Sequence, residues 1–120
     1  MFQQDWILRQ IEMMGVVMAR LLFGKDKPDY DIVEKTRLTD SDRLYLELVR
    51  LLGQGRINEA ENRLYESLDP SCLGTLEVAL TFYTRLNEYD DAYLEAHNYS
   101  REEIEQGLQD VMRRYGVQLP

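Results

Sequence analysis

The sequence predicts an all-α protein of about five helices, in which a long N-terminal helix precedes two antiparallel helical hairpins. Apolar residues recur at spacings of three and four, and glycine, proline and helix-capping residues separate these runs. No stretch alternates apolar and polar residues with β-branched enrichment, which is the pattern of a strand. With 120 residues the chain is long enough to bury a core without disulfides, so we expect a single domain over residues 1–120.

The first helix is predicted over residues 2–23. Its apolar positions follow spacings of 4, 3, 4 and 3, which place Ile7, Ile11, Met14, Met18 and Leu21 on one stripe. Three further residues, Trp6, Met13 and Val17, widen the stripe on one side. Gly24 is a typical C-terminal stop, so the N-terminal amphipathic helix occupies residues 1–24 and a polar linker occupies residues 25–38. Ile32 and Val33 are expected to hold this linker against the core.

The first hairpin is expected from residue 39 to residue 68. Several residues from Thr39 to Asp42 can cap a second helix, which ends at Gly53. The third helix spans residues 56–68 with Ala60 at its close contact. Because only Gly53, Gln54 and Gly55 separate the two helices, they should be antiparallel.

The second hairpin is expected from residue 69 to residue 116. Asp69 and Pro70 should cap and open a fourth helix over residues 71–86. Residues 87–99 are acidic and less regular, although residues 92–97 can form a helical turn or two. A capping box from Ser100 to Glu103 predicts the start of a fifth helix, which stops at Gly116.

Two resemblances accompany this pattern. The segment Leu52 to Leu64, with its glycine turn and its alanine followed four residues later by leucine, is similar to the second half of a tetratricopeptide repeat. This resemblance implies tetratricopeptide-like hairpins over residues 39–116. The segments at residues 1–6, 11–14, 58–61 and 96–100 together resemble a family of small bacterial proteins with no assigned activity. That family supplies no catalytic residues.

Charge and cysteine content exclude several classes of function. Fourteen Lys and Arg against 22 Asp and Glu leave a net charge of −8, which is the wrong sign for binding nucleic acid. Asp5 stands where a signal peptide needs positive charge, and Arg9, Glu12 and Arg20 interrupt any membrane-spanning run. The single cysteine, Cys72, suits a reducing compartment and is expected to be buried and inert. We therefore expect a cytoplasmic protein.

Nine residues are candidates for contact with a protein partner. Six come from the first helix and three are tyrosines of an acidic segment: Trp6, Ile7, Ile11, Met14, Met18, Leu21, Tyr89, Tyr93 and Tyr99. The helix stripe has three possible roles: a fifth core helix, self-association, or binding to a membrane surface. The acidic segment from Glu88 to Asp110 has eight carboxylates against Arg101 alone, a balance of −7. Either it is a solvated face or it docks a basic partner.

These patterns favour a non-enzymatic helical interaction or adaptor module that can form a homodimer through its first helix. No catalytic, cofactor-binding or metal-binding residue is predicted. One alternative is a small metal-dependent enzyme centred on His97, the only histidine, and its neighbouring carboxylates. Another is a peripheral membrane protein anchored by the first helix, but few basic residues flank the apolar stripe.

Overall fold

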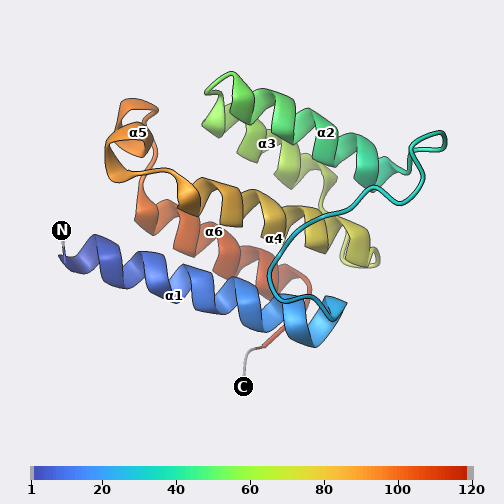
Figure 1. Ribbon diagram of the computed structural model, residues 1–120, viewed down its shortest axis with the longest axis horizontal. Coiled ribbons are helices and arrows are strands. Elements are labelled where there is room, and N and C mark those ends of the chain that lie inside the picture. Colours follow the sequence, from blue (N-terminus) through green and yellow to red (C-terminus); the bar gives the residue numbers. More distant parts are fainter. Residues whose placement is uncertain (1, 119–120) are drawn as a thin grey trace.

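The computed structural model describes residues 2–118, which form helices and connecting segments without any strand (Figure 1). The predicted all-α class is therefore confirmed. The helices are α1 (Phe2–Met18), continued by a π-helical turn η1 (Ala19–Phe23), then α2 (Asp40–Gly53), α3 (Ile57–Ser67), α4 (Leu73–Glu88), α5 (Asp91–Ala96) and α6 (Arg101–Arg114). No helix in this part of the chain is long and apolar enough to cross a bilayer.

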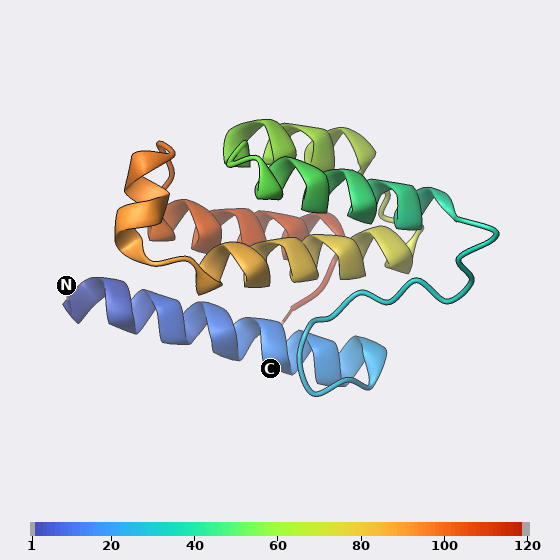
Figure 2. The same ribbon diagram turned by 45° about the horizontal axis from the view of Figure 1, so that its top comes forward.

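The helices lie in three layers, which are clearest when Figures 1 and 2 are compared. The antiparallel pair α2 and α3 forms one outer layer, and the antiparallel pair α4 and α6 forms the middle layer. Helix α1 lies on the opposite side of the middle layer, where it packs against both α4 and α6. The third layer therefore contains one long helix, whereas each of the other two contains a pair.

The helix ends follow local signals in the sequence. The side chain of Thr39 accepts a hydrogen bond from the Asp42 amide (3.1 Å), and the Asp42 carboxylate accepts one from the Thr39 amide (2.9 Å). Ser100 and Glu103 form the same reciprocal capping box at the start of α6. At the end of η1, Gly24 has a φ of 63°, a backbone conformation that favours glycine.

One predicted helix start is wrong. Asp69 does not cap α4, because its carboxylate accepts hydrogen bonds from the amide and hydroxyl of Ser71 and closes a local turn. Helix α4 begins two residues later than expected, at Leu73, with Cys72 as its N-cap residue. An aspartate followed by proline is consistent with either arrangement, so the sequence alone does not decide between a turn and a cap.

Tyr30 holds the long connection between η1 and α2 in place. Its backbone amide donates to Oγ1 of Thr81 in α4 (3.0 Å), and its hydroxyl donates to Oδ1 of Asp42 in α2 (2.6 Å). The expectation for Ile32 and Val33 holds in part: Ile32 packs at the edge of the core, but Val33 is 95% exposed. The linker is thus tied to two helices by polar contacts of a tyrosine.

Helices α4 and α6 approach each other closely at Gly107 and Tyr83. A Cβ on Gly107 of α6 would lie 2.5 Å from Cζ of Tyr83 in α4, which is closer than van der Waals contact allows. The Tyr83 side chain is fully buried, and its hydroxyl donates to Oε2 of Glu61 in α3 (2.6 Å). Gly107 therefore provides the space in which Tyr83 joins α4 to α3.

We expect the contribution of the Tyr30–Asp42 hydrogen bond to the free energy of unfolding to depend on pH. Hydrogen bonds from the Tyr30 hydroxyl and the Thr39 amide hold the pKa of Asp42 below its usual 3.8, and burial and the same contact raise the pKa of Tyr30 to about 12. A carboxyl group with a lowered pKa in the folded state adds stability above pH 3.8, and this contribution is lost as pH falls through the folded pKa. The loss in free energy of unfolding caused by Tyr30→Phe should therefore be larger near pH 6 than below pH 3, as measured by urea denaturation.

The matched control is Tyr45→Phe, which removes a different hydroxyl, one that accepts from Arg85. The loss in free energy of unfolding caused by Tyr45→Phe should not change between pH 6 and pH 3. An equal pH dependence of the two variants, or none in either, would contradict this account of Asp42.

Replacement of Gly107 by alanine should destabilise the protein by roughly 1–3 kcal/mol, because the added methyl group overpacks against Tyr83. The matched control is Gly53→Ala in α2, where a Cβ meets nothing within 4 Å. Since alanine favours a helix over glycine, Gly53→Ala should be neutral or stabilising by up to about 1 kcal/mol. Urea denaturation of both variants tests this prediction, and a neutral Gly107→Ala would show that α4 and α6 are farther apart.

Candidate functional site

The apolar stripe predicted on the first helix divides into two faces. Four of its residues are buried against α4 and α6 within the same chain: Ile7, Ile11, Met14 and Met18. The expectation that these four contact a partner is corrected by their burial, because this chain's own middle layer covers them. Periodicity identifies an apolar face but does not reveal whether the same chain or another chain covers it.

The second face of α1 is apolar and exposed. Trp6, Met13 and Leu21 keep 64%, 67% and 64% of their surface accessible, and Val17 is half-buried. These positions are separated by seven, four and four residues and continue along one side of the helix. We call Trp6, Met13 and Val17 of α1, together with Leu21 of the following turn η1, the outer face of α1. The sequence predicts Trp6 and Leu21 as contact residues and Met13 only as a residue that widens the stripe.

The charges around this outer face cancel. Asp5 and Glu12 supply two negative charges, and Arg9 and Arg20 supply two positive charges, so their sum is zero. All four residues are exposed. In a chain with a net charge of −8, this helix therefore offers a surface without the electrostatic repulsion that the rest of the molecule would bring.

The tyrosines of the acidic segment pack mainly within the chain. The rings of Tyr89 and Tyr93 stack with centroids 4.3 Å apart, and Tyr93 stacks in turn on His97 at 4.1 Å. Burial, followed by the neighbouring Tyr93, raises the pKa of Tyr89. Tyr99 is buried, and its hydroxyl donates to Oε2 of Glu61 (2.9 Å). The three predicted tyrosines therefore do not form one surface, because Tyr99 points into the core.

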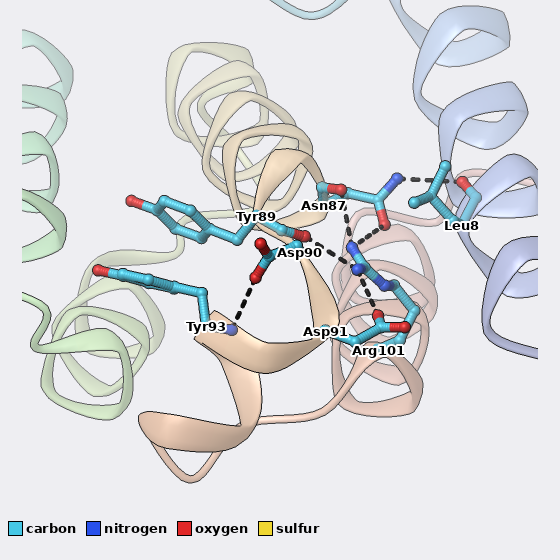
Figure 3. Close-up of polar contacts among 7 residues, drawn as sticks. All are labelled: Leu8, Asn87, Tyr89, Asp90, Asp91, Tyr93 and Arg101. Carbon is cyan, nitrogen blue, oxygen red and sulfur yellow. Dashed lines mark hydrogen bonds and ion pairs between the residues drawn. The ribbon is translucent and has the colours of Figure 1, made fainter. Parts of the chain in front are cut away.

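The most connected polar group in this region is Arg101, at the first position of α6 (Figure 3). Its guanidinium donates to the carbonyl oxygens of Asn87 (2.7 Å) and Tyr89 (2.9 Å), to Oδ1 of Asn87 (3.1 Å) and to Oδ1 of Asp91 (2.6 Å). The Asn87 side chain in turn donates to the carbonyl oxygen of Leu8 in α1 (3.0 Å). Only 2% of Arg101 is exposed.

The role of Arg101 was missed because the sequence shows it only as the single positive charge in an acidic run. The structure shows that this positive charge is buried and that the carboxylate of Asp91 offsets it. Asp90 caps α5, Glu103 caps α6, and Asp110 pairs with both Arg113 and Arg114. These four carboxylates thus have structural partners within the chain, which supports a structural use of the acidic segment over a docking use.

His97 also has structural contacts. Its Nδ1 donates to the carbonyl oxygen of Tyr93 (2.8 Å), and its ring lies against Gly55, where a Cβ would be 2.8 Å from Nε2. Gly55 has a φ of 74°, so this turn needs glycine for two reasons. Between residues 2 and 118, no three His, Cys, Asp or Glu side chains are grouped so that they could hold a metal ion.

Cys72 differs from the expectation of a buried, inert thiol. It is half-buried at the N-terminus of α4, and its Sγ lies 3.7 Å from Oγ of Ser41. A hydrogen bond from the Thr75 amide, followed by the Ser41 contact, lowers the pKa of the thiol. The thiol is only half-buried because α4 begins at Leu73, which leaves Cys72 outside the helix.

A surface groove of about 490 Å³ lies between α1, the linker and the C-terminal part of α4. Leu8, Val16 and Pro28 provide apolar walls, and Glu12 and Lys27 place opposite charges at the same groove. Asn87, which lines its base, is already hydrogen-bonded to Leu8 and Arg101. The Asn87 side chain at this groove is therefore already used in contacts within the chain.

Replacement of Arg101 by methionine should lower the free energy of unfolding by about 3–5 kcal/mol, because it leaves buried carbonyl groups without donors. The comparison variant is Asp91→Asn, which removes the negative charge that offsets the buried guanidinium but keeps an oxygen that can accept its hydrogen bond, so it should cost less than Arg101→Met. Urea denaturation of both variants measures the difference. Equal losses would mean that the ion pair, rather than the carbonyl contacts, stabilises this junction.

Comparison with known proteins adds a family but no activity. No curated protein and no solved structure matches the chain. One family model matches residues 1–116, and it describes a family of unknown function, DUF6483. The resemblance to a family without assigned activity is thus confirmed, whereas the tetratricopeptide-like character of the hairpins stays a prediction. Because the match covers nearly the whole chain, this protein belongs to the family of unknown function DUF6483.

Proposed function

We propose that this protein is a non-enzymatic helical interaction module that binds a protein partner through the outer face of α1. The observation that carries the proposal is the exposure of Trp6, Met13 and Leu21 on one side of a helix whose other side is core. Tryptophan is among the residues most enriched at the centres of protein interfaces, and methionine adapts its shape to a partner. An exposed apolar strip of this kind marks an interaction site more often than isolated surface leucines do.

The arrangement of the helices supports an adaptor role. The layers α2/α3 and α4/α6 are two stacked antiparallel pairs, and the connection held by Tyr30 ties them together. Such a scaffold supports α1 rigidly, because four α1 side chains are buried in the common core. A rigid support lowers the conformational entropy that is lost when the exposed side binds.

The remaining candidate residues support this proposal by their packing. His97, the centre of the enzyme alternative, is stacked on Tyr93 and bonded to its carbonyl oxygen. Tyr99 is committed to Glu61 in the core. We therefore propose a function based on α1, with a cytoplasmic location as suggested by the cysteine content.

The proposal is tested by replacing Met13 with a photo-crosslinking phenylalanine analogue in cells that produce the full chain. Since Met13 is exposed, the protein should fold, and irradiation should give a covalent adduct with one partner protein. Introduction of Trp6→Asp into the same protein should abolish the adduct, because a charge at the interface must be desolvated. The adduct is detected by mass on a denaturing gel and identified by mass spectrometry.

The control position is Asn62, which is exposed on α3 at the far side of the molecule. The same analogue there should give no specific adduct. Absence of any adduct at Met13, or equal labelling at Met13 and Asn62, would contradict an interaction through the outer face.

A further inference from the structure

We infer that the partner of this outer face is a second copy of the same chain, whose α1 lies antiparallel to the first α1 about a two-fold axis near Met13. The inference rests on the proposed function and adds the identity and the orientation of the partner. Three observations carry it: the unpaired third layer, the neutral charge of α1, and the order of residues along the helix.

One layer of the fold has a single helix, whereas the other two layers each have a pair. Antiparallel pairs occupy the first layer (α2 and α3) and the middle layer (α4 and α6), whereas α1 stands alone in the third. Its inner side covers the middle layer, and within the described part of the chain Trp6, Met13 and Leu21 on the outer face stay exposed. A second α1 laid beside the first completes this layer with an antiparallel pair like those in the other two.

Charge favours a second copy at this surface. Two whole chains carry −8 each and repel one another, but Asp5, Arg9, Glu12 and Arg20 make the surroundings of the outer face neutral. Approach through α1 therefore brings little net charge together. The same neutrality gives little attraction to anionic lipid, which needs an excess of basic residues beside the apolar face.

The order of residues decides the orientation. Trp6 precedes Met13 by seven residues, and Arg20 and Leu21 follow it by seven and eight. An antiparallel pair about Met13 thus sets Trp6 opposite Arg20 of the second copy and one position from its Leu21, and it sets Asp5 opposite that Leu21 and one position from that Arg20. A parallel pair would instead place Asp5 beside Asp5 and Arg20 beside Arg20, with like charges opposed along the contact.

The contact area between two α1 helices is small, so we expect weak association. One pair of helices about 33 Å long buries less area than the roughly 1,600 Å² of a standard stable interface. We therefore expect a dissociation constant on the order of 10 μM, so that the protein changes from monomer to dimer over an accessible range of concentration.

The first measurement is sedimentation of the purified full chain at 1 μM and at 200 μM. The mass should double at the higher concentration, and the emission of Trp6, the only tryptophan, should shift to shorter wavelength as its ring leaves water. Met13→Asp should raise the dissociation constant at least about tenfold. Glu66→Asp, an exposed α3 position away from α1, should change neither the mass nor the emission.

The second measurement fixes the orientation by disulfide formation in a Cys72→Ser background, where serine retains the preferred chemistry of a helix N-cap. Met13→Cys should form a dimer with itself, because a two-fold axis passes close to it. Trp6→Cys mixed with Leu21→Cys should form a crossed dimer, whereas Trp6→Cys alone should not. Circular dichroism and thermal melting of each variant establish that it is folded.

Each other outcome overturns the inference. A monomeric mass at both concentrations removes the dimer, and rapid self-linkage of Trp6→Cys replaces the antiparallel pair by a parallel one. Binding of monomers to vesicles of phosphatidylcholine and phosphatidylglycerol would assign the outer face to a membrane. If the chain is monomeric but the photo-crosslinker at Met13 captures a different protein, this inference fails while the proposed function stands; if neither experiment gives a partner, both fail.

Discussion

The buried guanidinium of Arg101 is the contact on which the arrangement of the helices depends. Arg101 donates four hydrogen bonds to Asn87, Tyr89 and Asp91, at the end of α4 and the start of α5. These hydrogen bonds offset the free-energy cost of burying its charge. The carbonyl groups at the C-terminus of α4 need donors, and the fixed fork of an arginine can bind two of them together. Asn87 then extends the network to the backbone of α1 at Leu8, so one cation positions elements of the second and third layers.

This network gives several carboxylates of the acidic segment a structural use. Asp91 offsets Arg101, while Asp90 and Glu103 serve as caps at the starts of two helices, where the helix dipole favours negative charge. Acidic residues are thus concentrated where the chain changes direction twice within a few residues. The tyrosines between them stack on His97 or enter the core, and so they hold α5 against the turn at Gly55.

Helix α1 shows how one apolar stripe can serve two purposes. Its inner residues complete the core, and its outer residues remain exposed because the third layer has no second helix within the chain. The energetic cost of leaving a tryptophan and a methionine in water is modest for each residue, about 1–3 kcal/mol, but it is recovered only when another surface covers them. The proposed interaction follows from this geometry together with the neutral charge of the helix, not from any catalytic group.

The helical class, the limits of most helices and the capping boxes at Thr39 and Ser100 follow from the sequence alone, because these features depend on hydrogen bonds between residues within four positions of each other. The three-dimensional packing is needed to show which side of α1 is buried, that Tyr99 reaches Glu61, and that Arg101 and Asn87 connect α6 to α1. Those contacts join residues far apart along the chain; Asn87 and Leu8 are 79 positions apart. Periodicity shows that a face is apolar, but the packing of distant helices determines what covers it, since burial depends on three-dimensional neighbours that no local pattern encodes.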